Sequence, residues 1–169
     1  MASTGVSNSE LVRRTFELIN THDVEALRPM WTEETFEQFP DRTCRGADEM
    51  AAYFGELFAA MPDVRMDVQA VAVDRDDAFV RWRLTGTHTG AAFSGIEPTG
   101  KRIELDGIDH FVIRDGKVAT NFVVFDQMQV ARALGMLPPQ DSPADRAVKA
   151  AFNAKNRAVA AIRGVRNGS

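Results

Sequence analysis

The chain has 169 residues, of which 44% are hydrophobic and 26% are charged, a balance typical of one soluble globular domain with a core of its own. Its formal net charge of -4 disfavours nucleic acid as the main partner. The single cysteine, Cys44, cannot form an internal disulfide, and neither a signal peptide nor an apolar run near the roughly 18 residues of a membrane span is apparent. We therefore expect a cytoplasmic protein that binds no membrane.

The N-terminal part of the sequence predicts helices with one short strand between them. The stretch SNSE at residues 7–10 matches the capping box that opens a helix, and Asp23 can cap a second, shorter helix. A strand is expected around Phe36, followed by a loop through Pro40 and the tripeptide CRG. Pro62 ends the third helix. The expected helices cover residues 8–20, 24–30 and 47–61.

The next part of the chain alternates apolar and polar residues, as strands with one buried face do. The Gly-, Pro- and Thr-rich segment 86–101 is expected to hold a loop. A helix over residues 127–134 follows the last strand and stops at Gly135. Helices followed by an antiparallel meander predict an α+β fold in which the sheet packs one face on the helices. The expected strands cover residues 64–74, 77–88, 101–114 and 117–126.

Residues 8–136 are expected to form one domain, and residues 137–169 a linker followed by a basic helical tail. The stretch LPPQDSP is typical of a linker, and Ser142 can cap a helix over residues 143–164. Residues 140–169 contain six Lys/Arg and two Asp/Glu, a balance of +4, which leaves -8 for the 139 residues before them. This tail could bind anions, or it could be a solvated helix packed on its own domain or on a sister subunit.

The expected direction of the acidic side chains follows from one turn. Asp115-Gly116 predicts a two-residue hairpin of type I′, in which Arg114 faces Lys117. Counting back from the turn places Asp109 opposite Phe122, so that both side chains share a face of the sheet. This face is the more apolar one, and we expect it to turn inward. The inward residues of the last strand are then Val118, Thr120, Phe122, Val124 and Asp126.

The preceding strand can be sorted by the same alternation. Trp82 lies on the inward face, and His88 is expected near the rim of that face. Arg81 and Arg83 have the opposite parity and point outward. His110 also points outward, where we expect a subunit interface.

Two acidic side chains on the inward face of the sheet indicate a catalytic site. An unpaired carboxylate in an apolar environment costs several kcal/mol or takes up a proton, so a chain that needed only a core would not place Asp109 and Asp126 there. Acids of raised pKa in an apolar pocket are suited to proton transfer. Four residues separate Phe122 from Asp126, which predicts a distance of roughly 13 Å between the two acids at about 3.3 Å per residue. At that distance they do not share a proton.

Several stretches together resemble the SnoaL-like polyketide cyclases, a family of the NTF2-like superfamily with limonene epoxide hydrolase and ketosteroid isomerase as relatives. The stretches are VRRTFELINTHDVEALRPMWTEE, GTHTG, PTGK, GIDHFVIRDGKV and an Asp followed by ARALG. The resemblance covers residues 8–136. It implies a curved antiparallel sheet wrapped by helices into a cone with an apolar pocket. It also implies a homodimer through the outward sheet face, or a homotetramer.

The resemblance further implies a reaction that uses no cofactor. In the characterised cyclases an aspartate just before the last helix is the general acid/base of an intramolecular aldol ring closure, and that position is Asp126 here. A pocket histidine of those enzymes is replaced by Asp109, which differs from histidine in charge and proton affinity. Tryptophans often found on the last strand are replaced by Phe122 and Phe125.

Each candidate residue also has a structural alternative. Asp126 could simply cap the helix that follows it. A slip of one residue in the register would place Asp109 outside and His110 inside. His88 could anchor a loop, and the aromatic candidates could belong to the core. The expected catalytic residues are Asp126 and Asp109. The expected substrate-binding residues are His88, Trp82, Phe111, Phe122, Val124, Trp31 and Phe39. Three scattered histidines have no metal-ligand spacing, so no metal is expected.

Three functions are compatible with these residues. The first is a cofactor-free acid/base enzyme that closes a ring in a hydrophobic, oxygenated small molecule, most simply an aldol-type closure of a polyketide. The second is hydrolysis or internal opening of an epoxide, which needs two acids close to one small reacting group and usually an inward arginine. The third is a module that only binds a small ligand.

Overall fold

The computed structural model describes residues 7–167; residues 1–6, which belong to the segment considered for a signal peptide, lie outside it. The helices are α1 (Asn8–Ile19), α2 (Val24–Leu27), η1 (Arg28–Met30), α3 (Gly46–Ala60), α4 (Gln127–Leu134) and α5 (Pro143–Asn167). The strands are β1 (Phe36–Gln38), β2 (Thr43–Arg45), β3 (Arg65–Asp74), β4 (Asp77–Thr87), β5 (Arg102–Arg114) and β6 (Lys117–Phe125).

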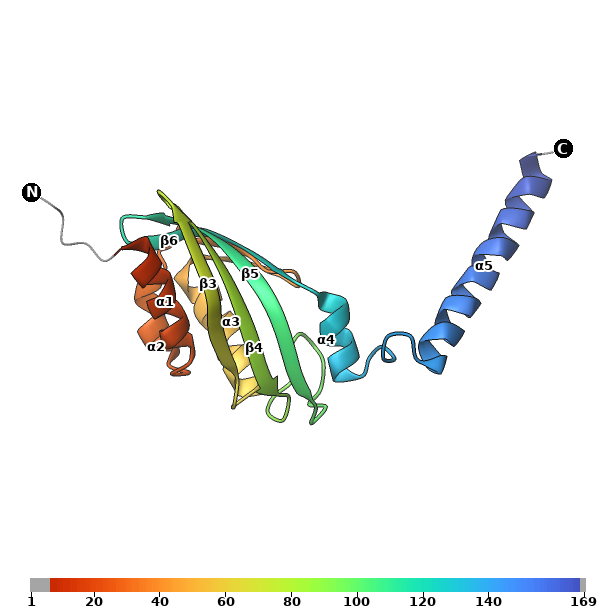
Figure 1. Ribbon diagram of the computed structural model, residues 1–169, viewed down its shortest axis with the longest axis horizontal. Coiled ribbons are helices and arrows are strands. Elements are labelled where there is room, and N and C mark those ends of the chain that lie inside the picture. Colours follow the sequence, from red (N-terminus) through yellow and green to blue (C-terminus); the bar gives the residue numbers. More distant parts are fainter. Residues whose placement is uncertain (1–6, 168–169) are drawn as a thin grey trace, which may run out of the picture.

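The six strands form one sheet in the order β2-β1-β6-β5-β4-β3. The sheet is curved without closing into a barrel, and α1, α2 and α3 lie on one side of it (Figure 1). This is the α+β fold expected from the sequence. Within residues 7–167, no helix combines the length and the hydropathy needed to cross a membrane.

The helix boundaries follow the capping signals of the sequence. The backbone N–H of Glu10 donates to Ser7 Oγ at 3.2 Å, and the Ser7 N–H donates to Glu10 Oε2 at 2.9 Å, which completes the capping box. Asp23 Oδ1 accepts from two backbone N–H groups of α2, at 3.0 and 3.1 Å. Gly135 ends α4 with φ of 81°, a left-handed conformation that glycine adopts without strain. The predicted helices at these places are confirmed.

The expectation of a loop after Pro40 is wrong, because this segment contains β2. The short strands β1 and β2 pair antiparallel, with Glu37 opposite Cys44. β1 then joins the main sheet by parallel pairing with β6, which brings Glu37 beside Asn121. A three-residue strand is too short to show the two-residue alternation of a sheet, so the sequence revealed neither β2 nor the partner of β1.

The hairpin between β5 and β6 is confirmed at its turn, but its register changes further on. Asp115 and Gly116 have φ of 51° and 71°, as a type I′ turn requires, and Arg114 pairs with Lys117. Two residues later β6 carries a bulge at Ala119, because Ile113 pairs with Val118 while the preceding residue of β5 pairs with Thr120. Every pair beyond the bulge is shifted by one residue.

This shift reverses the faces of β6. Asp109 lies opposite Val123 and keeps its inward direction, whereas Phe122 and Val124 point outward and are 49% and 51% exposed. The prediction that Phe122 and Val124 line the pocket is therefore wrong. The inward residues of β6 beyond the bulge are Asn121, Val123 and Phe125.

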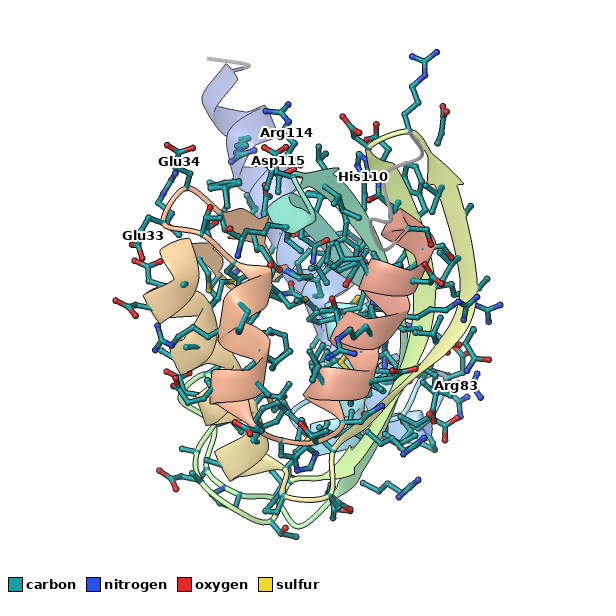
Figure 2. The ribbon with its side chains drawn as sticks, turned by 90° about the vertical axis from the view of Figure 1, so that its left-hand side faces the viewer. Glu33, Glu34, Arg83, His110, Arg114 and Asp115 are labelled. Atoms are coloured by element: carbon teal, nitrogen blue, oxygen red, sulfur yellow. The ribbon has the colours of Figure 1, made fainter. Side chains whose placement is uncertain are left out.

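The polar side chains that the sequence placed on the outer face of the sheet do lie there. Arg83 projects away from the helices (Figure 2) and donates from Nε to Asp106 Oδ1 at 2.8 Å. Arg81 lies beside the same carboxylate. His110 points outward as expected, stacks on Phe79 and lies 2.6 Å from Asp77 Oδ1 through Nε2. Its place at a subunit interface stays a prediction.

Inside the sheet, Trp82 and Gly107 are paired across β4 and β5 at very close range. A Cβ atom on residue 107 would lie only 2.1 Å from the ring of Trp82. Only glycine lets the indole lie against the neighbouring strand here. That position directs the indole Nε1 of Trp82 toward Asp109.

We expect Gly107→Ala to lower the free energy of unfolding by about 1–3 kcal/mol, the usual cost of overpacking a core, because Trp82 must leave its position. Chemical denaturation followed by tryptophan fluorescence measures this. Gly55→Ala in α3 is the matched control, since no atom lies within 4 Å of its Cβ position and alanine favours a helix. Equal stability of the two variants would contradict the assigned contact.

Candidate active site

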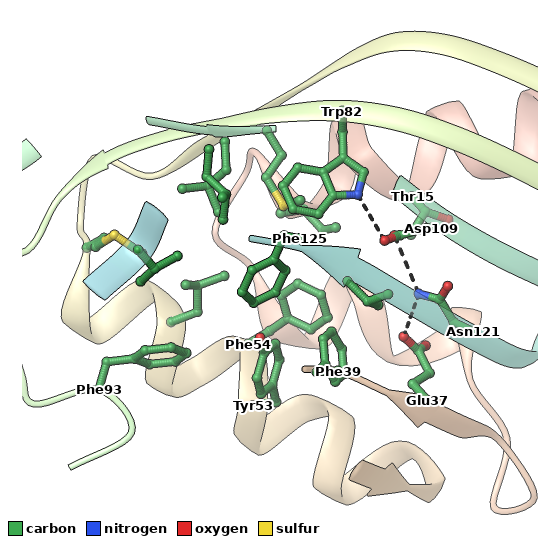
Figure 3. Close-up of a pocket in the computed structure, with 18 of the residues that line it drawn as sticks. Thr15, Glu37, Phe39, Tyr53, Phe54, Trp82, Phe93, Asp109, Asn121 and Phe125 are labelled. Atoms are coloured by element: carbon green, nitrogen blue, oxygen red, sulfur yellow. Dashed lines mark hydrogen bonds between the residues drawn. The ribbon is translucent and has the colours of Figure 1, made fainter. Parts of the chain in front are cut away.

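A cavity of about 120 Å³ lies between the inner face of the sheet and the helices. At roughly 10–15 Å³ per water-sized group, it has room for about ten such groups. Its wall is mostly apolar, with a few convergent polar side chains, as is typical of small-molecule sites. The aromatic residues of the wall include Trp31 and Phe111. They also include Phe39, Tyr53, Phe54 and Trp82 (Figure 3).

Asp109 is one of the two carboxyl groups in this wall. It lies in the middle of β5, opposite Val80 of β4, and is 6% exposed. Trp82 Nε1 donates a hydrogen bond to Asp109 Oδ1 at 2.9 Å. The sequence predicted this inward direction, and the structure places Asp109 in the cavity wall.

Glu37 of β1 is the second carboxyl group, and it is 3% exposed. Trp31 Nε1 donates to Glu37 Oε1 at 2.9 Å. Each of the two acids therefore has its own indole donor. Trp31 lies between η1 and β1 in the chain, whereas Trp82 belongs to β4.

Asn121 of β6 joins the two acids. Its Nδ2 donates to Glu37 Oε2 at 3.0 Å and, with a longer contact, to Asp109 Oδ2 at 3.4 Å (Figure 3). The two carboxyl groups therefore lie within two hydrogen-bond lengths of each other. This separation is suited to a pair of groups acting on one small reacting unit.

Burial disfavours the charged form of both acids. It raises the pKa of Asp109 from 3.8 to about 7, against the hydrogen bonds from Trp82 and Asn121, which lower it. It raises the pKa of Glu37 from 4.5 to about 8; the hydrogen bonds from Asn121 and Trp31 oppose this shift, and the charge of Asp109 adds to it. The charge of Asp109 makes a second negative charge on Glu37 less favourable, so between about pH 7 and about pH 8 the pair holds one proton and one negative charge.

The prediction that Asp126 points into the pocket is wrong. Asp126 is exposed and lies outside the cavity wall, and its Oδ1 accepts from the backbone N–H of Met128 at 2.8 Å and of Gln129 at 3.2 Å. It is the N-cap of α4. The bulge at Ala119 is the physical reason, because it turns alternate residues of β6 to the opposite face.

Of the other predicted site residues, two lie on the outer face of the sheet and the rest line the cavity. Phe122 and Val124 lie on the outer face, as described above. His88 is buried beside the cavity, and its Nε2 lies 3.2 Å from the carbonyl oxygen of Ala91, which fits the loop-anchoring alternative. The predicted residues that line the cavity are Asp109, His88, Trp82, Phe111, Trp31 and Phe39.

Sequence reasoning missed Glu37 and Asn121. A glutamate between Phe36 and Gln38 in a short strand gave no sign that the acid, rather than the phenylalanine, turns inward. Asn121 was placed outside because the bulge was not foreseen. The only available signal was that Trp31 and Trp82 both carry a donor that needs a partner when buried.

Comparisons with known proteins identify relatives of this chain. The model of the SnoaL-like polyketide cyclase family matches residues 9–134. A SnoaL-like protein from Jannaschia sp. CCS1 is 25% identical, with 82% of this chain and 98% of that chain covered and a TM-score of 0.71. AclR from Streptomyces galilaeus is 24% identical, with 92% and 94% covered and a TM-score of 0.68. IdmH from Streptomyces antibioticus is 23% identical, with 75% and 97% covered and a TM-score of 0.65. A search of the curated proteins found no match. The NTF2-like fold implied by the sequence resemblance is thus confirmed.

The raised pKa values predict how stability depends on pH. Between the ordinary values of 4.5 and 3.8 and the folded values of about 8 and 7, the folded chain holds protons that the unfolded chain has released. The free energy of unfolding should therefore fall as the pH rises from about 4 to about 8. Urea denaturation at intervals over this range measures the slope.

The double variant Glu37→Gln, Asp109→Asn should lose most of this slope, because neither amide titrates. Asp126→Asn is the control and should keep it, since asparagine caps a helix about as well as aspartate does. Parallel pH profiles of the parent chain and the double variant would show that these two acids titrate normally.

Proposed function

The chain belongs to the SnoaL-like polyketide cyclase family, and we propose that it closes a ring in a hydrophobic, oxygenated small molecule by acid/base catalysis with Glu37 and Asp109. The family supports a cyclase-type function. The reaction that the site supports best is an intramolecular aldol-type closure of a polyketide-like carbonyl compound.

One observation carries this proposal: two buried carboxyl groups share one amide donor inside an apolar cavity. Asn121 keeps Glu37 and Asp109 within reach of one reacting unit. A purely structural acid would be expected to pair with a cation. Among the described residues that line the cavity there is no Lys or Arg. A matched acid and base near neutral pH are what proton transfer to and from carbon requires.

Asp109 has the lower pKa of the two acids and is therefore the base. Glu37 has the higher pKa and is the acid. The ionised Asp109 takes a proton from a carbon that lies between two carbonyl groups of the substrate. The resulting enolate carbon attacks a second carbonyl carbon, and protonated Glu37 gives its proton to the oxygen of that carbonyl. The pair ends with its single proton on Asp109, and proton exchange with water after product release restores the starting state. No proton is gained or lost overall, and no step needs a cofactor.

The cavity wall supplies orientation and selects the charge of the substrate. Aromatic surfaces such as those of Trp82 and Phe111 bury apolar rings, which holds the two carbonyl groups near the acids. A substrate with a free carboxylate would meet the negative charge of the pair without a compensating cation. We therefore expect a neutral ketone or ester as substrate.

The close carboxyl pair also favours a second candidate, the opening of an epoxide by an internal hydroxyl group. Glu37 would protonate the epoxide oxygen while Asp109 takes the hydroxyl proton. The short separation of the two acids meets one requirement of this reaction. The other usual requirement, an inward arginine, is not met by Arg81 and Arg83, which lie on the outer face.

We expect Glu37→Gln and Asp109→Asn each to lower the rate of ring closure at least about 100-fold, because each removes one partner of the proton transfer. The probes are neutral aryl β-keto esters that carry a second carbonyl group, with the cyclic product followed by liquid chromatography. Asp126→Asn is the matched control, since it makes the same carboxyl-to-amide change outside the cavity and should keep the activity.

A different pattern would overturn the assignment. Loss of activity in Asp126→Asn together with full activity in Glu37→Gln would return the catalytic role to the end of β6. Activity of the parent chain on hydroxy-epoxides, with none on any keto ester, would replace the aldol reaction by epoxide opening at the same pair of acids.

A further inference from the structure

Tyr53 of α3 carries a hydroxyl group without a protein partner in the cavity. The side chain is 7% exposed and belongs to the cavity wall. Its ring points from α3 into the cavity (Figure 3). Within residues 7–167 no hydrogen bond joins this hydroxyl to another protein group. Because a buried tyrosine O–H usually finds a partner, the missing partner points to a ligand.

The ring that carries this hydroxyl is packed on several sides. It stacks on Phe39 with 4.0 Å between the ring centres, and Phe54 and Phe93 contact it edge-on. The guanidinium carbon of Arg42 lies 5.1 Å from the ring centre, within the range of a cation–π contact. The hydroxyl therefore has a fixed position before a substrate enters, which is what a donor in electrostatic catalysis requires.

The other hydrogen-bond donors in the cavity wall already have partners. The two indoles and the amide described above donate to the catalytic acids. Thr15 Oγ1 donates to a backbone carbonyl oxygen of α1 at 3.0 Å, and His88 Nε2 lies 3.2 Å from the carbonyl oxygen of Ala91. His88 Nδ1 has no partner, but it is an acceptor when Nε2 carries the hydrogen. Among the described residues of the wall, the O–H of Tyr53 is therefore the donor that remains for a ligand.

The proposed reaction needs such a donor. When Asp109 takes the proton from the carbon between two carbonyl groups, negative charge moves onto an oxygen of the substrate. An oxygen anion in an apolar cavity is strongly disfavoured unless a donor faces it. Glu37 does not serve this oxygen, because its proton goes to the second carbonyl group. The described residues of the wall include no Lys or Arg that could do so instead.

We propose that Tyr53 is a catalytic residue whose hydroxyl donates a hydrogen bond to the enolate oxygen of the substrate. This role rests on the proposed function and extends it, since the ring closure described above assigns no donor to that oxygen. The proton stays on Tyr53 throughout, so the proton transfers of Asp109 and Glu37 are unchanged. The role also narrows the substrate: the carbonyl that becomes the enolate must reach α3 while the carbon beside it faces β5.

The protonation of Tyr53 agrees with a donor. Burial raises the pKa of its hydroxyl; the charges of Asp41 and Asp109 add to the rise, and the charge of Arg42 opposes it. The hydroxyl therefore keeps its proton at neutral pH, and it does not replace Asp109 as the base.

The variant Tyr53→Phe tests this role, because it removes one oxygen and keeps the ring that packs on Phe39. We expect kcat for ring closure to fall at least about 100-fold, as on loss of one oxyanion donor. KM should change less than about threefold, because the neutral carbonyl gains less from the hydrogen bond than the enolate does. Thr120→Val removes an exposed hydroxyl of β6 outside the cavity wall and is the control that should keep both constants. Thermal melting checks that both variants are folded.

Substituents on the aryl ring of the β-keto ester probes separate catalysis from a packing role. A 4-nitro group stabilises the enolate by itself, so the loss of kcat in Tyr53→Phe should be smaller for this probe than for its 4-methoxy counterpart. A packing role would give equal losses for the two probes and would overturn the proposal.

Carbon-13 NMR reports on the hydrogen bond without any turnover. Tyr53 is the only tyrosine of the chain, so tyrosine labelled at Cζ gives one signal. An aryl β-keto ester without a second acceptor carbonyl cannot close a ring. Its addition should move the Tyr53 signal, whereas an alkylbenzene of the same size should leave it nearly unchanged.

Three results would overturn this role and leave the proposed function intact. The first is ring closure by Tyr53→Phe at the parent rate while Asp109→Asn is inactive. The second is a higher KM with unchanged kcat, which would mean that the hydroxyl binds only the neutral substrate. The third is a Tyr53 signal that the keto ester does not move although the parent chain turns over the ring-closing probes. A parent chain that closes no ring in any probe would instead overturn the proposed function and the enolate role together.

Discussion

The hydrogen bonds of a single amide hold the proposed catalytic pair together. Asn121 Nδ2 lies within hydrogen-bonding distance of both Glu37 and Asp109, two acids from strands far apart in the sequence. Three strands must meet for this to happen: β1 brings Glu37, β5 brings Asp109, and β6 lies between them with Asn121 turned inward. The inward turn of Asn121 depends in its turn on one extra residue, Ala119, in the bulge of β6. The geometry of the site therefore depends on the register of β6, because moving this strand by one residue would separate the two acids from their shared donor.

Burying two acids side by side is costly for folding and useful for chemistry. Both carboxyl groups receive an indole N–H and a share of the Asn121 amide, so hydrogen bonds offset part of their desolvation. No cation among the described residues of the cavity wall neutralises them, so the pair keeps a proton that ordinary acids would release. The same apolar wall that raises both pKa values is suited to the apolar substrate that we propose. The close contact of Trp82 with Gly107 belongs to this arrangement, since it aims the indole donor at Asp109.

The sequence predicted the features that depend on neighbouring residues. It did not predict those that depend on contacts between distant parts of the chain. Helix caps such as Ser7 and the turn at Asp115-Gly116 are read from a few neighbouring residues, and they predicted the α+β fold and, apart from β2, the order of the elements. The direction of Asp109 also followed, because β5 alternates regularly from the turn. The face of β6 did not, because its sequence FVVF at residues 122–125 offers one phenylalanine and one valine to either side. A slip of one residue therefore changes no apolar pattern, but it removes Asp126 from the cavity and brings Asn121 in. Glu37 was hidden by a three-residue strand whose parallel partner lies more than eighty residues away.

Glu37 and Asp109 together are expected to carry one proton between about pH 7 and about pH 8. Carbon-13 NMR of the side-chain carboxyl carbons of these two residues, assigned by their loss in Glu37→Gln and Asp109→Asn, measures this directly over a pH titration. Both signals should move in coupled steps centred at about pH 7 and about pH 8. If both signals complete their change near pH 4, as exposed acids do, the pair is fully ionised at neutral pH and cannot serve as the acid and base proposed for this site.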